Sequence, residues 1–336
     1  MLWSTLSNLF APRFDWIQVE VTTHCLAACR YCPHTVYREH WSSRHLDLNT
    51  FQSLLPVLNR ARLVHLQGWG EPLLHPDFFT MAALARRAGC RVGTTTNGMH
   101  LEVDSLRRLV DLEVAVVAFS LAGVGEKNDE VRRGTRFGTV LEKMAALKEI
   151  KARKGALLPQ VHVAYMLLSS GLEDLALLPQ ALAGLGVGQV VVSTLDFVAS
   201  PALAQESLRL LPPEEYREVA ARLDELADRG RRQGLEIYSY LPHPDKSGQL
   251  CPENPARALC VAADGALFPC VFLNLPVSEE TWVSREGERP YRNLKFGALE
   301  EGQPFQKIWR SPAYREFRRA WARSDLPPAC SGCLKP

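Results

Sequence analysis

The sequence predicts an α/β fold in which a parallel sheet is covered by helices. Strand-like and helix-like runs alternate through the first two thirds of the 336 residues, and this alternation is typical of βα units. Apolar residues make up 46% of the chain, enough for a sizeable core, but no run of about 18 of them could form a transmembrane helix. The length exceeds one ordinary domain and fits one large plus one small domain.

Six short runs, apolar or alternating, are the strand candidates. Each is followed by turn residues or by a helical pattern, as a βα unit requires. They span Ile17–Val21, Leu63–Gln67, Arg91–Thr95, Val114–Ser120, Val161–Leu167 and Gln189–Ser193.

The segments between these strands carry helical patterns. Six βα units make three quarters of a (βα)8 barrel, in which working residues sit at the carboxyl ends of the strands. The helix candidates are Asn49–Leu58, Asp77–Ala88, Asp104–Val110, Thr139–Arg153 and Leu172–Ala183.

The pattern changes after the sixth unit. Pro212–Gln233 predicts a long charged helix and Glu236–Tyr240 a short strand, after which the turn residues of Pro242–Gly248 break the pattern. We place a domain boundary there. The expected division is an N-terminal lead at 1–12, a main domain at 13–245 and a small C-terminal α+β domain at 246–336.

Charge excludes some function classes. The formal net charge is +2, which gives no case for attraction to nucleic acid or to a membrane. Basic pairs such as Arg86–Arg87 and Arg231–Arg232 fall in helical patterns and indicate solvated faces. The run Met1–Leu6 lacks the basic region of a signal peptide, so we expect a cytoplasmic protein.

Cysteine usage indicates two metal sites. In a cytoplasmic chain the nine cysteines are not expected to form disulfides. Eight of them fall in two groups, one near each end, and Cys90 alone lies apart in a position typical of a buried core thiol. Segregated groups of this kind favour metal ligation.

The first group is Cys25, Cys29 and Cys32, with CxxxCxxC spacing directly after the first predicted strand. Thiolates this close can hold a soft metal or an iron–sulfur cluster. Three ligands leave one metal position open, which is typical of a reactive site rather than a structural one. His24 and His34 flank the cysteines, but we interpret them as solvated loop residues because three thiolates already complete the pattern.

Glycine and polar motifs follow the next strands in turn. They are Gly68–Pro72 (GWGEP), Thr95–Gly98 (TTNG), the strand end at Ser120, and Asn128–Gly134 (NDEVRRG). Each alone is most simply a turn or a helix cap. Their order at successive strand ends makes coincidence remote.

Together these motifs resemble the radical S-adenosylmethionine (SAM) enzymes. The resemblance implies a partial (βα)6 TIM-type barrel and a [4Fe-4S] cluster on the three cysteines, with SAM chelating the fourth iron. Trp69 stands where the family's GGEP motif has its first glycine. The implied SAM contacts are Tyr31 near the adenine, Gly68, Gly70 and Glu71 in the GGEP position, Asn97, Ser120 and Arg133. The neighbouring Arg132 is the alternative to Arg133.

Near the C-terminus, Cys251 and Cys270 are followed by Cys330 and Cys333 in a CxxC pair. This pattern resembles the auxiliary-cluster domains called SPASM and twitch. The chain ends three residues after Cys333, so only one auxiliary [4Fe-4S] cluster is expected. Cys260 is too near Gly265 for the family pattern and falls in a predicted strand, Leu259–Ala263, so it is a spare. Zinc at the same thiolates remains an alternative. The implied ligands are Cys251, Cys270, Cys330 and Cys333.

The resemblance also implies an activity. An external one-electron reductant of the flavodoxin or ferredoxin class drives cleavage of SAM, and the 5′-deoxyadenosyl radical takes hydrogen from a substrate. We expect peptide, protein or enzyme-cofactor maturation; the runs His65–Pro72 and Cys251–Pro255 resemble maturases of tungsten-containing oxidoreductases. The alternatives are a radical SAM dehydrogenase of a small metabolite and a non-catalytic zinc-binding scaffold.

Overall fold

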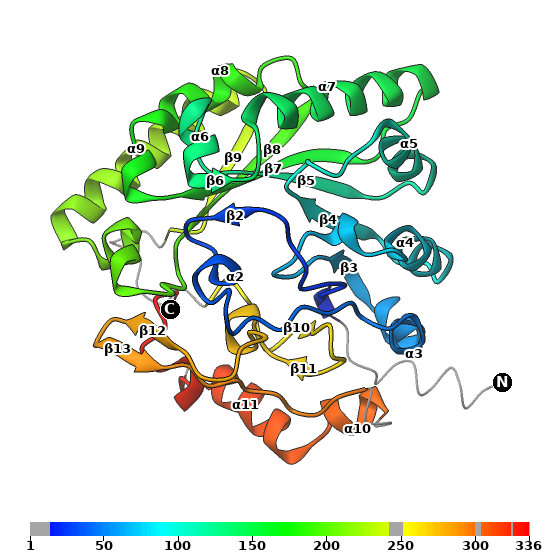
Figure 1. Cartoon of the computed structure of the whole chain (residues 1–336), viewed down its shortest axis with the longest axis vertical. Coiled ribbons are helices and arrows are strands. Elements are labelled where there is room, and N and C mark those ends of the chain that lie inside the picture. The colour runs from blue at the N-terminus through cyan, green and yellow to red at the C-terminus, as the bar shows by residue number, and fades with distance from the viewer. Residues whose placement is uncertain (1–13, 242–250, 300–303, 324, 336) are drawn as a thin grey trace.

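A nine-stranded sheet forms the centre of the protein, and helices cover its outer face (Figure 1). The computed structural model describes residues 14–241, 251–299, 304–323 and 325–335. The strand order is β11-β10-β1-β3-β4-β5-β7-β8-β9. These strands are β1 Phe14–Val19, β3 Ala61–Leu66, β4 Val92–Thr96, β5 Val116–Leu121, β7 Gln160–Leu167, β8 Val187–Thr194, β9 Glu236–Ser239, β10 Ala258–Val261 and β11 Leu267–Phe268.

The six predicted strands are present as β1, β3, β4, β5, β7 and β8, each within three residues of its expected bounds. All neighbouring pairs among them are parallel, and β9 extends the parallel run beside β8. The predicted partial barrel of βα units is therefore confirmed.

The helices largely match the predicted periodicity. Helix α3 begins at Asp47, whose carboxylate accepts hydrogen bonds from the amides of Asn49 and Thr50 at 2.9 and 3.1 Å. The long charged helix is confirmed as α9. The α-helices are α2 Pro33–Val36, α3 Leu48–Leu58, α4 Phe78–Arg87, α5 Val103–Asp111, α6 Glu126–Val131, α7 Phe137–Lys154, α8 Leu178–Leu182, α9 Pro213–Arg232, α10 Phe305–Trp309 and α11 Pro312–Ala322.

One predicted helix is wrong in extent. Leu172–Ala183 contains a 3-10 turn at Asp174–Leu177 and only then the short α8, which has Pro179 in its first turn. Proline has no amide hydrogen to donate and suits the first turn of a helix, so the α-helix in this segment begins only beside Pro179. Among the described residues, no helix is long and apolar enough to cross a membrane.

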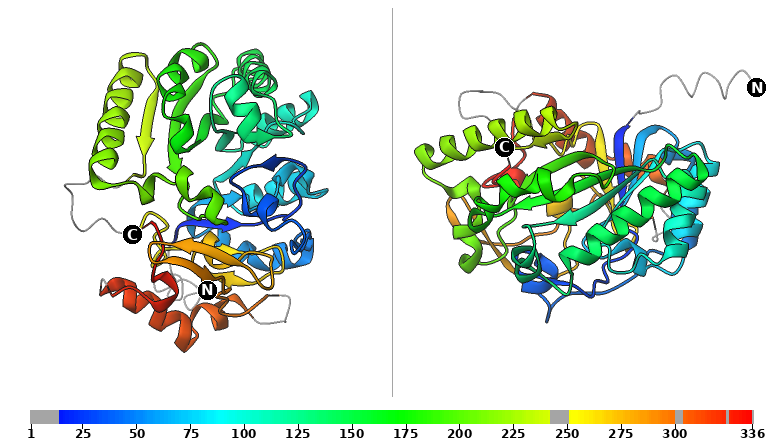
Figure 2. Two further views of the ribbon diagram at one scale, coloured as in Figure 1. Left: turned by 60° about the vertical axis from the view of Figure 1, so that its left-hand side comes forward. Right: turned by 90° about the horizontal axis from the view of Figure 1, so that it is seen from above.

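The C-terminal part of the chain joins the sheet of the barrel. Strand β10 pairs parallel with β1, and β11 turns back antiparallel after the turn at Asp264 and Gly265. Helices α10 and α11 continue the packing, since Trp309 meets Phe14 of β1 with ring centroids 4.9 Å apart. Figure 2 shows the yellow strands β10 and β11 and the orange-red helices α10 and α11 gathered at the end of the molecule that holds β1. The predicted boundary at 242–248 lies outside the described residues.

The two faces of the sheet differ in burial. In β7, Val161, Val163 and Tyr165 are buried toward the helices, while His162 and Ala164 alternate with them and remain half-buried on the concave side. This alternation leaves the inner face accessible. Two small ribbons complete the fold: β2 Ala28–Cys29 with β6 Arg132–Arg133, and β12 Thr281–Ser284 with β13 Gly287–Pro290.

Candidate active site

The first cysteine group lies in the loop that follows β1. Cys29 is buried, and Cys25 and Cys32 are partly exposed. Burial raises the pKa of the Cys25 thiol to about 11 and that of Cys32 to about 12. Ligation to a metal deprotonates a thiol outright, and three closely spaced cysteines are a donor set that fits an iron–sulfur centre.

A two-stranded ribbon decides which arginine faces the cysteines. Strand β2 pairs with β6 so that Cys29 lies opposite Arg132 and Ala28 opposite Arg133. Arg132 is buried and donates from Nη1 to the hydroxyl of Tyr31, while Arg133 is exposed. Among the described residues, the buried Nε of Arg132 has no hydrogen-bond partner. The geometry thus favours Arg132, the alternative assignment, over Arg133 as the arginine of the site.

The GWGEP turn is packed tightly against the cysteine loop. The amide of Glu71 donates to the carbonyl of His24 at 2.8 Å. A Cβ on Gly70 would lie 2.5 Å from the carbonyl oxygen of Thr22, and one on Gly68 would lie 2.2 Å from Cγ of Glu20. Both glycines are therefore required for close approach within the protein.

Glu71 joins the ends of two strands. Its carboxylate accepts hydrogen bonds from the Thr96 hydroxyl and the Asn97 amide, both at 2.7 Å. Burial raises the pKa of this carboxyl. The Asn97 side chain accepts from the amide of Met99 at 2.9 Å, which is an ordinary turn contact. Ser120 lies half-buried near the end of β5, at the same edge of the sheet.

The histidines beside the cysteines have other neighbours. The His24 ring stacks on His45 at 4.5 Å, and the His34 ring meets Trp41 edge-on at 5.2 Å. Burial lowers the pKa of His34. These contacts agree with loop histidines rather than ligands.

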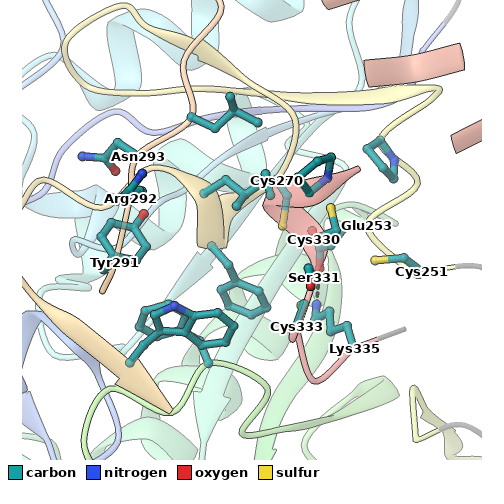
Figure 3. Close-up of a pocket in the computed structure, with 18 of the residues that line it drawn as sticks. Cys251, Glu253, Cys270, Tyr291, Arg292, Asn293, Cys330, Ser331, Cys333 and Lys335 are labelled. Atoms are coloured by element: carbon teal, nitrogen blue, oxygen red, sulfur yellow. Dashed lines mark hydrogen bonds and ion pairs between the residues drawn. The ribbon is translucent and has the colours of Figure 1, made fainter. Parts of the chain in front are cut away.

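The second cysteine group lines a cavity of about 490 Å³. Figure 3 shows the sulfur-bearing side chains gathered on one side of this cavity, with Tyr291, Arg292 and Asn293 on the other. The cysteines on its wall are Cys251, Cys270, Cys330 and Cys333.

Cys260 does not line this cavity. It is 3% exposed within β10, between Gln18 of β1 and Phe268 of β11. It nevertheless lies near enough to Cys270 to contribute to the raised pKa of that thiol. Among the described residues, no three His, Cys, Asp or Glu side chains are arranged to hold a single metal ion.

Two contacts join the parts of the chain that carry the two cysteine groups. Tyr31, beside Cys32, packs on the hydrophobic cluster that contains Leu334, beside Cys333. From the GWGEP turn, the indole nitrogen of Trp69 donates to the carbonyl of Val271, beside Cys270, at 3.3 Å. Both contacts hold the C-terminal segments against the barrel.

Glu20 is a residue of the site that sequence reasoning missed. One carboxylate oxygen accepts from the Trp69 amide at 2.9 Å and the other from the Ala263 amide at 3.3 Å, so it joins the GWGEP turn to the β10–β11 hairpin. Burial raises the pKa of the Glu20 carboxyl to about 7, although the two hydrogen bonds act in the opposite direction. An acidic residue at the end of an apolar strand was the available signal.

Comparison with known proteins agrees with this arrangement. The model of the radical SAM superfamily matches residues 19–168, and the model of the SPASM iron–sulfur cluster-binding domain matches residues 251–334. The chain is an enzyme with a radical SAM domain, which binds a [4Fe-4S] cluster and SAM, and a SPASM domain, which binds auxiliary iron–sulfur clusters.

Two curated relatives illustrate the range of this family. The cofactor-modifying protein of the tungsten-containing aldehyde ferredoxin oxidoreductase of Pyrococcus furiosus is 25% identical over 331 residues, covering 95% of this chain and 86% of the relative. The PqqA peptide cyclase of Gluconobacter oxydans is 26% identical over 258 residues, covering 75% and 68%.

Two solved structures share the fold. Native anSMEcpe with bound AdoMet has a TM-score of 0.67 at 16% identity, covering 95% of this chain and 88% of that one. Streptococcus suis SuiB bound to the precursor peptide SuiA has a TM-score of 0.66 at 13% identity, covering 99% and 73%.

Proposed function

We propose that this enzyme modifies a peptide, a protein or an enzyme-bound cofactor by radical SAM chemistry. The support for this substrate class is that one relative is described as cofactor-modifying and another as a peptide cyclase.

The observation that carries the site assignment is the β2–β6 ribbon. It brings Cys29 and a buried, incompletely bonded Arg132 to the same place. We assign Cys25, Cys29 and Cys32 to the SAM-associated cluster and Arg132 to the carboxylate of SAM, because a guanidinium suits a carboxylate in both charge and shape. Bound there, the cluster supplies the electron that cleaves SAM to methionine and a 5′-deoxyadenosyl radical.

The remaining residues of the motifs position this site. Glu71 holds the ends of β3 and β4 together through Thr96 and Asn97. Tyr31 fixes the Arg132 guanidinium on one side, which leaves its Nε for an incoming anion. Ser120 and the GWGEP turn border the same edge, and their contacts with SAM belong to the proposal.

We assign one auxiliary cluster to Cys251, Cys270, Cys330 and Cys333, on the strength of their common cavity. The proposal divides the chain into the main domain at 13–245 and the auxiliary domain at 246–336. It places the enzyme in the cytoplasm, with a flavodoxin or ferredoxin as the external reductant.

Iron content and SAM cleavage test this proposal. Anaerobic reconstitution should give about eight irons per chain, four for each cubane cluster. Changing Cys25, Cys29 and Cys32 together to Ala should leave about half of that iron and abolish formation of 5′-deoxyadenosine with dithionite.

A matched triple change at Cys251, Cys270 and Cys333 should leave the other half and keep the SAM-associated cluster. Unchanged iron in the first triple variant would refute its ligand assignment. Zinc with little iron in anaerobically purified protein would instead support the zinc scaffold.

A further inference from the structure

A lysine side chain reaches into the cavity of the auxiliary cysteines. Lys335 lies two residues after Cys333, and its side chain is only 12% exposed. Figure 3 shows it beside Cys333 and extended toward Glu253. A buried ammonium group needs paired charges to offset its desolvation, so this position requires an explanation.

The contacts of Lys335 join the segments that carry the cysteines. Its Nζ forms an ion pair with Glu253, two residues after Cys251, and lies 4.8 Å from the ring centre of Phe272, two residues after Cys270. Lys335 therefore meets both of the other cysteine-bearing segments from the Cys330–Cys333 side.

A second acid, Asp196, is 3.8 Å from the same Nζ but has its own counter-ion. Arg209 donates from Nε to Asp196 at 2.8 Å, and both side chains are almost fully buried. Because Arg209 already neutralises the charge of Asp196, the main counter-ion of Lys335 is Glu253.

The position of Lys335 is fixed by the residue before it. Leu334 is fully buried in a cluster with Leu195 and Val198, which follow β8. Its carbonyl accepts a hydrogen bond from Arg285 at 3.2 Å. Anchored in this way, Lys335 is not a mobile surface cation.

We propose that Lys335 is a positioning residue that retains the auxiliary cluster and makes its reduction easier. This inference rests on the proposed cluster on Cys251, Cys270, Cys330 and Cys333. A cluster held by four thiolates is anionic, and reduction by one electron from an external donor adds a further negative charge without moving a proton. A fixed ammonium nearby favours that reduced form, since local charge and hydrogen bonding set the potentials of such clusters.

The experiment uses the full chain with Cys25, Cys29 and Cys32 changed to Ala, so that only the auxiliary cluster is observed. Iron content and the midpoint potential, followed by electron paramagnetic resonance, are measured for Lys335→Met, Lys335→Arg, Glu253→Gln and the Lys335→Met/Glu253→Gln pair. Lys307→Met is the matched control, because Lys307 is an exposed lysine on α10.

Lys335→Met should lower the ratio of reduced to oxidised auxiliary cluster at a fixed solution potential by about tenfold. This change corresponds to a midpoint potential about 59 mV lower for a one-electron couple. Glu253→Gln should shift the ratio the other way, and the double variant should return toward the parent. Iron lost in Lys335→Met but kept in Lys335→Arg would also support a requirement for the charge.

Two results would overturn the inference. One is a potential and iron content in Lys335→Met equal to those of the Lys307→Met control. The other is equal iron loss in Lys335→Met and Lys335→Arg, which would indicate packing rather than charge. Absence of iron from the background protein itself is a separate outcome, because it would refute the proposed auxiliary site.

Discussion

The carboxyl of Glu20 should make the stability of the protein depend on pH. Its pKa rises from 4.5 to about 7 in the folded protein because the group is buried, at 3% exposure, beneath the GWGEP turn. At about 1.4 kcal/mol for each tenfold change in proton affinity, this rise corresponds to about 3 kcal/mol. Glu20→Gln removes the ionisable group while preserving its shape.

The direction follows from proton binding. Below pH 4.5 the group is protonated in both states and contributes no pH dependence. Between pH 4.5 and about 7 the unfolded chain loses its proton first, so stability falls as pH rises. Above about pH 7 the folded group is ionised as well, and the whole loss is present.

The measurement is the difference in unfolding free energy between parent and Glu20→Gln apoprotein, obtained by urea titration at several pH values. Other titrating groups cancel in this difference. Gln can accept only one of the two amide hydrogen bonds, from Trp69 or Ala263, which adds a constant offset of about 1–3 kcal/mol. The unfolding free energy of Glu20→Gln minus that of the parent should therefore rise by about 3 kcal/mol between pH 4.5 and 8. A difference that stays constant over this range would refute the reasoning.

Three further predictions concern single positions. Arg132→Lys should raise the SAM concentration needed for 5′-deoxyadenosine formation about tenfold or more, because charge-assisted hydrogen bonds are lost. Arg133→Lys should change that concentration little. The opposite result for the two variants would assign Arg133 to the site instead. Cys260→Ala should keep the iron of the auxiliary cluster, and iron loss in that variant would make Cys260 a ligand. Gly70→Ala should destabilise the protein by about 1–3 kcal/mol, because the added Cβ would overlap backbone atoms. Gly188→Ala is the control: its Cβ would have no atom within 4 Å, so its thermal unfolding should match that of the parent.

The barrel was predictable because its information is local. Each strand and most helices are encoded by a period of apolar residues, and the cysteine spacing is visible in one short run. The choice between Arg132 and Arg133 shows where local information stops. Which arginine faces inward depends on the register of a ribbon with only two residue pairs, and a slip of one residue reverses the two faces. No propensity or spacing encodes that register.

Contacts between distant segments were equally invisible. Trp69 was recognised only as a departure from the GGEP pattern, yet its indole bonds Val271, 202 residues away. The departure thus has a physical reason, because a glycine could not reach the auxiliary domain. The residue that departs from the family motif thus contacts the segment that carries Cys270.

The last described residues, 330–335, are also held in place by contacts with distant segments. Cys330 and Cys333 mark a ligand pair by spacing alone, but spacing does not say what holds the pair against the barrel. Leu334 does so by entering the cluster on which Tyr31 also packs, and Lys335 then faces Glu253. A buried leucine and a buried lysine in succession require one side chain to enter apolar packing and the next to meet an acid. This alternation holds the Cys330–Cys333 segment against the barrel through Leu334 and against the segment of Cys251 through Lys335.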